Sequence, residues 1–224
     1  MIIIHGDNQV ESRQFLVTQI EQAKTKGKEV IRFEGKEIEL EQLYQALEGL
    51  SLLGKKRLVV IENLFTKSLP KSVIDYLTKT LPKNLIIWEG KEVSQSKISQ
   101  FKAQARFFKL PPIIFKFLDA FLPGNSRQSL IWLKQAVGQS SAENVFYMLA
   151  RQIRYLIIAH QMDRKGLSGL HPFQQQKIAS QAKKFELSQL LTLHRKLLYI
   201  DWQQKTGQAP MDLAGQLDLL VASL

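Results

Sequence analysis

The chain has 224 residues, of which 45% are hydrophobic and 23% charged, and it contains no cysteine. These values fit a soluble globular protein of one or two domains, and they exclude a disulfide framework and any cysteine-ligated zinc module. The net charge of +11 is spread along the chain, which suits a nucleic acid or an acidic partner and equally a basic protein with neither. A chain without cysteine fits a reducing cytoplasm, and because no apolar run is long enough to span a bilayer we expect no membrane segment.

The first half of the chain is predicted to alternate strands and helices. Strands are expected at 2–5, 29–33, 57–61, 84–88 and 105–110, and helices at 9–25, 40–50 and 71–81. Runs that are apolar throughout, such as 57–61, are typical of parallel strands covered on both faces. We therefore expect a doubly wound parallel sheet.

The turn after the first strand lies where a nucleotide-binding α/β domain carries its P-loop. Here the turn reads Gly6-Asp7-Asn8, and no Gly-Lys-Ser/Thr occurs anywhere in the chain. Asp7 and Glu11 at the start of the next helix would repel a triphosphate. Glu62 follows the strand 57–61, where such domains place acids for magnesium, but it is a lone acid followed by Asn63. The sequence predicts an ATPase-like architecture with a degenerate P-loop and no bound nucleotide.

Pro111-Pro112 marks a change to an all-helical pattern. Helices are expected at 113–121, from Ser126 to Gly138, from a capping box of Ser140 and Glu143 through Ile157, at 172–184, from Ser188 through Leu198, and at 212–224. The predicted organisation is an α/β domain at 1–110 followed directly by a helical domain at 111–224.

No constellation typical of catalysis or metal binding is found. The four histidines, His5, His160, His171 and His194, have no metal-ligand spacing, and no serine lies in a Gly-x-Ser-x-Gly elbow. We predict no catalytic residue, no metal site and no cofactor.

Ser51, Leu52 and Leu53, called the SLL segment below, lie between the predicted helix 40–50 and the strand 57–61. Gly54 and the three cations Lys55-Lys56-Arg57 follow them. Two large aliphatic side chains at such a turn would suit an exposed plug for a partner's pocket, or they could close the core beneath the sheet. The three cations could contact phosphate or an acidic surface, or form a solvated turn.

The chain resembles the delta subunit of the bacterial DNA polymerase III clamp loader. The resemblance in the second half rests on four pieces in the family's order: Ile114 to Ala120; Tyr147 to Arg154; His171-Pro172-Phe173 with Gln181-Ala182 and Lys184-Phe185; and Asp201 with Lys205-Thr206-Gly207. The first half resembles the family in strand order and in residues 51–60, where the family carries its clamp-binding motif.

The resemblance implies an AAA+-type domain that binds no ATP and a helical collar that assembles with other clamp-loader subunits. It implies that Ser51, Leu52 and Leu53 bind and open the sliding clamp as a hydrophobic wedge, and that primed DNA is a partner within the complex. Two departures stand out: Leu53 replaces the family's usual Phe, and the helical lid domain is missing between residues 110 and 114. A degenerate P-loop nucleotidase and a generic DNA-binding adaptor remain as alternative functions.

Overall fold

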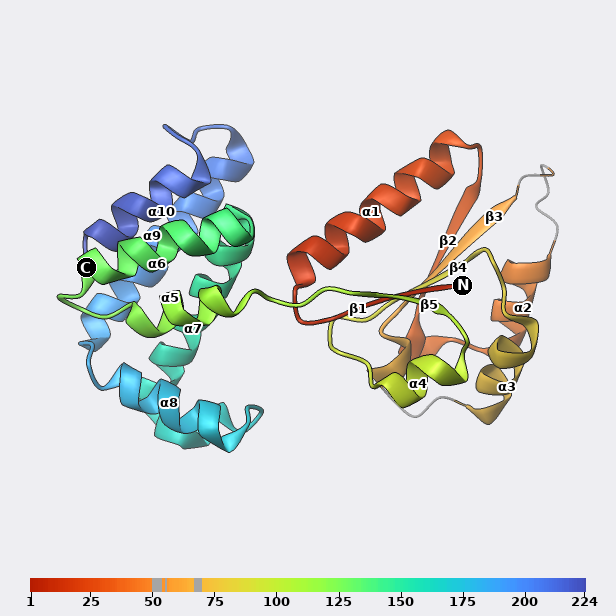
Figure 1. The fold of residues 1–224 in the computed structure, drawn as a ribbon, viewed down its shortest axis with the longest axis horizontal. Helices are drawn as coiled ribbons and strands as arrows, with labels where there is room; N and C mark the ends of the chain where they lie inside the picture. The colour runs from red at the N-terminus through yellow and green to blue at the C-terminus, as the bar shows by residue number, and fades with distance from the viewer. Residues whose placement is uncertain (50–53, 55, 67–69) are drawn as a thin grey trace. The chain divides into compact units, whose positions relative to one another are not determined.

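The computed structural model of the chain describes residues 1–49, 54, 56–66 and 70–224. They form two compact units, Met1–Lys109 and Leu110–Leu224 (Figure 1). Every strand in the described residues belongs to the first unit, and the regular elements of the second unit are all helical. The fold class expected from the sequence, a parallel-sheet α/β domain followed by an all-α domain, is confirmed.

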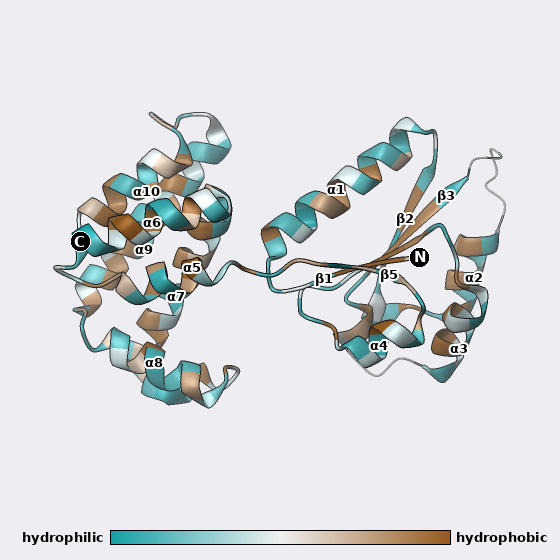
Figure 2. Cartoon of the chain, in the orientation of Figure 1, coloured by the Kyte–Doolittle hydropathy of each residue, from teal (hydrophilic) through white to brown (hydrophobic). Residues whose placement is uncertain are grey.

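The first unit is built on a five-stranded parallel sheet. Its strands are β1 (Ile2–His5), β2 (Glu29–Glu34), β3 (Arg57–Glu62), β4 (Leu85–Trp88) and β5 (Gln104–Phe107), in the order β2-β3-β4-β1-β5. All four pairings are parallel; β4 is buried along its whole length, and β1 and β3 are buried except at one or both ends. Figure 2 shows the sheet mostly in the brown of hydrophobic residues. The carboxyl ends of all five strands therefore lie along one edge of the sheet, and the amino ends along the other.

Alternate side chains of the strands enter two separate cores. Ile4, Val60 and Trp88 pack with α1 (Gln9–Thr25) on one face of the sheet. Ile3, Val59 and Ile87 pack with α2 (Leu40–Glu48) and α3 (Lys71–Thr80) on the other face. This division follows from the two-residue period of a strand. The short α4 (Gln95–Gln100) was not expected, because its six residues are mostly polar and carry no helical period.

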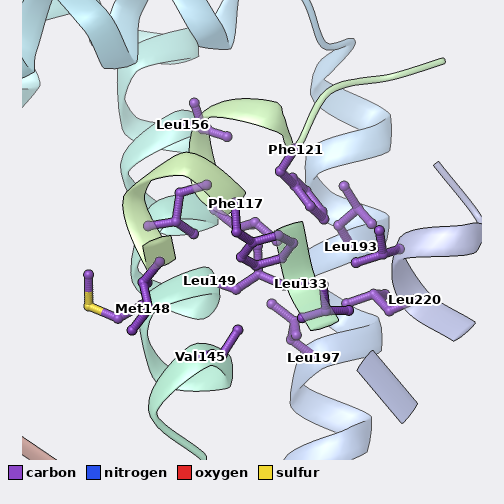
Figure 3. Packing of buried hydrophobic residues seen from close by; sticks show 14 of the residues in the cluster. Phe117, Phe121, Leu133, Val145, Met148, Leu149, Leu156, Leu193, Leu197 and Leu220 are labelled. Carbon is purple, nitrogen blue, oxygen red and sulfur yellow. The ribbon is translucent and has the colours of Figure 1, made fainter. Parts of the chain in front are cut away.

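The second unit contains six α-helices packed around one core. They are α5 (Pro112–Ala120), α6 (Ser126–Gln139), α7 (Ala142–Met162), α8 (Pro172–Ala182), α9 (Leu187–Thr206) and α10 (Leu213–Ala222). Figure 3 shows Phe117 and Phe121 at the centre of this core, with Leu149, Leu193 and Leu220 around them. Three 3-10 helices complete the described elements: Gly35–Glu37, Leu64–Thr66 and Asp163–Leu167.

Three predicted helix starts are wrong by one or two residues. The N-caps are Asn125 for α6, Ser141 for α7 and Glu186 for α9, in place of Ser126, Ser140 and Ser188. The capping box forms between Glu186 and Gln189, and Ser140 instead accepts a hydrogen bond from the side chain of Asn144. Gly138 also lies inside α6 and does not end it. In each case neighbouring polar residues could all cap, and tertiary packing selects among them.

Candidate functional site

The turn from β1 to α1 has few residues that could surround a phosphate group. Helix α1 begins at Gln9, three residues after Gly6, and Asn8 caps it by accepting a hydrogen bond from the Glu11 amide at 3.2 Å. Gly6 has φ 135°, and a Cβ there would lie 2.0 Å from the Phe108 carbonyl oxygen. The Asn8 amide donates to the same oxygen at 3.0 Å. The turn is therefore packed directly against the chain that follows β5.

An arginine occupies the place that a magnesium ligand has in a P-loop. Counted from Gly6, Arg13 stands at the Ser/Thr position of the pattern Gly-x-x-x-x-Gly-Lys-Ser/Thr. Its Nη1 lies 2.6 Å from Oε2 of Glu62, and its guanidinium carbon lies 3.5 Å from the centroid of the Trp88 ring. Glu62, which the sequence placed as a remnant of a magnesium acid, is thus paired with a cation of the protein itself. The sequence analysis did not single out Arg13, although counting the positions of the P-loop pattern from Gly6 would have identified it.

A cleft of about 710 Å³ opens at this edge, and buried polar groups fix its walls. Glu89 is buried and accepts a hydrogen bond from the Phe65 amide at 2.7 Å. Burial raises the pKa of the Glu89 carboxyl, and the backbone donors of Phe65 and Leu64 partly oppose that rise. The lining mixes Lys36, Lys91 and Lys97 with acidic residues, so the cleft has no single sign of charge.

His5, at the end of β1, stabilises the same carboxyl edge of the sheet. It is buried, its Nδ1 accepts a hydrogen bond from the Val93 amide at 3.2 Å, and its ring stacks on Phe107. Burial lowers the pKa of His5, and the charge of Glu92 opposes this more weakly. The neutral imidazole therefore holds the loop after β4 through this hydrogen bond.

Two further features are absent from the described residues: a metal-binding cluster and a membrane-spanning helix. No group of three or more His, Asp or Glu side chains in the described ranges could hold a metal ion. In the same residues no helix is long and apolar enough to cross a membrane.

The SLL segment lies outside the described residues, as does Lys55, but both flanks of the segment are described. The preceding helix α2 ends at Glu48 with Gly49 as its C-cap, and β3 begins at Arg57. Arg57 Nη1 donates to the carbonyl oxygens of Gln45 at 3.0 Å and Gly49 at 3.1 Å. Arg57 Nε donates to Oε2 of Glu29 at 3.1 Å. One side chain thus joins the end of α2 to the starts of β2 and β3.

Two further contacts hold the end of α2. The Tyr76 hydroxyl of α3 donates to Oε1 of Glu48 at 2.9 Å, and Asn84 Nδ2 donates to the Leu47 carbonyl at 3.4 Å. Burial raises the pKa of Tyr76, and its hydrogen bond to Glu48 adds to the rise. The helix that leads into the SLL segment is therefore fixed to its neighbours at its last turn.

Residues from three of the pieces that carried the resemblance in the second half meet in space. Gln152 Nε2 donates to Oε1 of Gln181 at 2.7 Å, and Gln181 Nε2 donates to the carbonyls of Leu118 at 2.8 Å and Phe121 at 3.0 Å. The ring of Phe121 also stacks on that of Phe185. Gln181 is buried, so these bonds tie α5, α7 and α8 together in a place where an unpaired amide would be costly. These motif residues are thus explained by packing within the unit.

Helix α9 presents apolar side chains to solvent. Leu198 is 63% exposed, Tyr199 58% and Trp202 45%, and the last two rings stack with centroids 5.7 Å apart. A groove of about 610 Å³ runs beside them, lined by Phe146, Leu197 and Leu213 among others. Exposed apolar residues that gather in this way are typical of a surface that binds another protein.

Comparison with known proteins places both units in one family. Residues 4–110 match the family described as DNA polymerase III, delta subunit, and residues 112–222 match the DNA polymerase III delta subunit, C-terminal domain. No curated protein matches the chain. Among solved structures, the Bacillus subtilis DNA clamp loader delta protein is similar at 14% identity and a TM-score of 0.44, over 99% of this chain and 94% of that one. Because the two family matches together span nearly all of the sequence, this chain belongs to the delta-subunit family of the DNA polymerase III clamp loader.

Proposed function

We propose that this chain acts in the cytoplasm as the clamp-loader subunit that binds the sliding clamp through Ser51, Leu52 and Leu53 and holds one clamp interface open. In this proposal it has no catalytic site and binds no ATP, and other subunits supply ATP hydrolysis. The lid domain is missing, so the sheet domain at 1–110 joins the collar at 111–224 directly. Primed DNA is reached within the assembled loader.

The observation that carries the proposal is the family match over both units, which includes the SLL segment within residues 4–110. Two leucines also provide enough energy for a wedge. Burying each leucine side chain contributes about 1.5–3 kcal/mol, so the pair could contribute about 3–6 kcal/mol before the costs of ordering. Leu53 in place of the family's usual Phe makes this wedge smaller.

The carboxyl edge of the sheet supports the absence of ATP binding. A triphosphate with magnesium would have to displace the Arg13–Glu62 pair and enter a turn of three residues that lacks the P-loop Lys. This geometry disfavours the alternative of a degenerate nucleotidase. The alternative of a DNA-binding adaptor has no comparable structural support beyond the net charge.

The exposed face of α9 supports assembly through the helical unit. Leu198, Tyr199 and Trp202 would lose their exposure against another clamp-loader subunit, and aromatic side chains are common at the centres of such interfaces. We therefore assign this face to the collar contact with the other loader subunits.

The proposal is tested by the double substitution Leu52→Ala/Leu53→Ala in a titration with the sliding clamp of the same organism. We expect clamp binding to weaken by roughly 2–4 kcal/mol, the range of hot-spot truncation, while the melting temperature stays nearly unchanged. The matched control is Leu191→Ala/Leu219→Ala, which removes two exposed leucines of the helical unit and should leave clamp binding unaltered. A large fall in melting temperature with unchanged affinity of the folded fraction would show that Leu52 and Leu53 are core residues.

A further inference from the structure

Strand β5, the outermost strand on one side of the sheet, is bordered by basic residues alone. From Val93 to Leu118 the sequence contains five basic residues and no acidic residue. Three of the five, Lys102, Arg106 and Lys109, lie on β5 or within two residues of its ends, and all three are exposed. Although the net charge is spread along the whole chain, a local excess thus gathers at this strand. These three residues are called the β5 cations below.

The β5 cations have no acidic neighbour to neutralise them. No ion pair joins any of the three to an acidic side chain in the described part of the chain. The outermost strand on the other side, β2, differs, because Arg32 lies between Glu29 and Glu34, and Glu29 pairs with Arg57 at 3.1 Å. One outer strand therefore carries both signs of charge and the other only positive charge, which attracts a polyanion.

The main chain of β5 adds hydrogen-bond donors on its outer side. The Phe108 amide donates to the His5 carbonyl of β1 at 2.8 Å, so it points toward β1. Residues of a parallel strand direct their main-chain groups to alternate sides, so the amides of Ala105 and Phe107 point away from β1. No strand of the described residues lies on that side of β5. Basic side chains and main-chain amides are the groups that bind DNA phosphates.

An added strand from another protein fits the same groups less well. Strand β5 has only four residues, so only two of them direct main-chain groups outward. Short outer strands with charged side chains are a means by which sheets resist pairing with further strands. A DNA backbone needs no ladder of evenly spaced bonds, because each phosphate binds separately to a cation or an amide.

The length of this basic border suits a DNA strand. A rise of about 3.3 Å per residue places Lys102 and Lys109 roughly 20 Å apart. A DNA strand carries about six phosphates over that length. Beside the cations, Phe107 is 47% exposed, and its ring is held by stacking on His5 with the centroids 5.0 Å apart. An exposed aromatic ring of this kind offers a surface on which an unpaired base can stack.

We propose that the outer side of β5 is a DNA-binding surface, on which Lys102, Arg106 and Lys109 bind phosphates of primed DNA without sequence preference. The inference rests on the proposed function for its choice of DNA as the partner. It adds a surface of the sheet domain that contacts the DNA directly, and it depends neither on the SLL segment nor on the clamp.

The test is a titration of fluorescently labelled primed DNA with the full chain, followed by anisotropy at several salt concentrations and without clamp. In Lys102→Gln/Arg106→Gln/Lys109→Gln, the slope of log K against log salt should become shallower by about 2–3, because each lost phosphate contact removes about 0.9. Binding at about 50 mM salt should weaken at least ten-fold. Thermal melts show whether the variant is folded.

The matched control is Lys28→Gln/Arg32→Gln/Lys36→Gln at the other outer strand, β2. It removes the same net charge at nearly the same spacing, from a strand that also carries Glu29 and Glu34. We expect its salt slope to differ from that of the wild type by less than about 1, the contribution of a single phosphate contact.

A second variant covers the case in which the triple variant folds poorly. Arg106→Glu changes one exposed side chain and places an acidic residue between Lys102 and Lys109. We expect it to weaken DNA binding at about 50 mM salt more than five-fold, and more than Arg106→Gln does, because a carboxylate repels phosphate and a neutral amide does not.

Several results would overturn the inference. They are a wild type that does not bind DNA at low salt, a wild-type salt slope in the β5 triple variant, and an equal loss in the β2 control, which would show that the net charge alone sets binding. If the triple variant does not fold, wild-type affinity in Arg106→Glu overturns it. Poly-glutamate that binds as tightly as DNA and is lost in the same variants would assign the surface to an acidic protein.

The proposed function is tested separately, because the DNA titration contains no clamp. The β5 variants should bind the clamp as the wild type does. If Leu52→Ala/Leu53→Ala leaves clamp binding unchanged while the β5 variants lose DNA binding as expected, the proposed function fails and the DNA surface stands. That result would favour the alternative of a DNA-binding adaptor.

Discussion

An arginine lies at each edge of the sheet, and the two arginines differ in their partners and in their roles. At the carboxyl edge, Arg13 pairs with the side chain of Glu62 and stacks on Trp88, so it occupies a place where a ligand could sit. At the amino edge, Arg57 pairs with main-chain carbonyls and holds two ends of the chain together. A sheet of this topology can thus be closed at its carboxyl edge by contacts within the chain, while its amino edge leads into the SLL segment, for which we propose a partner.

The closed edge is held by contacts within the protein. Glu62, Glu89 and His5 each have a partner among the described residues. The open edge leads into residues for which we propose a partner in another protein. Substitutions at the two edges should therefore change different properties.

The first prediction concerns Arg13→Ala at the closed edge. Glu62 is only 16% exposed, so removal of its cation should lower the free energy of unfolding by about 1–2 kcal/mol, allowing for the partial exposure of Arg13. Neither the wild type nor the variant should bind Mg-ATP, because both lack the P-loop Lys. Urea unfolding and calorimetric titration measure the two effects, with Arg106→Ala as the control for loss of an exposed arginine. Saturable micromolar binding of Mg-ATP by the wild type would revive the nucleotidase alternative.

The second prediction is a smaller, pH-dependent effect at the same edge. Burial lowers the pKa of His5, so the folded protein binds a proton there less readily than the unfolded chain. The corresponding stability is fully present above the unfolded pKa of about 6.5 and is lost as the pH falls below it. We expect His5→Gln, whose amide oxygen can still accept from the Val93 amide, to lose less stability than the wild type between pH 7.5 and pH 5.

The difference should be under about 1 kcal/mol and is measured by urea unfolding at the two pH values. The raised pKa of Glu89 works in the opposite direction, but it is present in both proteins and cancels in the comparison. Parallel losses of stability in wild type and variant would show that His5 does not titrate with folding.

The elements of this fold were largely predictable because their apolar residues follow simple periods. The predicted strands at 57–61 and 84–88 agree with the structure to within one residue at each end. The predicted strand at 105–110 was too long, because the Phe108 amide bonds to the His5 carbonyl at 2.8 Å and its own carbonyl accepts from Asn8 at 3.0 Å, which ends the ladder. Period alone does not show where a tertiary contact ends an element.

The candidate sites were predictable only in part, because the sequence does not show which residues come into contact in the folded protein. The missing P-loop residues could be read directly, and the SLL segment could be singled out by its two leucines beside glycine and cations. The partners of Arg13 and Arg57 could not, because Glu62 and Glu29 come near only when the sheet has formed. A basic residue in a sequence could form an ion pair with many acidic residues. The order of the strands decides which acidic residue lies close enough to do so.

The most direct test of the account is amide hydrogen exchange of the wild-type protein with and without the sliding clamp. We expect new protection on clamp binding in peptides that span residues 44–57, and no change in peptides that span the carboxyl edge at 6–13 and 62–65. Addition of Mg-ATP to the isolated protein should protect neither region. Protection by the clamp at the carboxyl edge with none at 44–57, or protection of the carboxyl edge by Mg-ATP, would contradict the account.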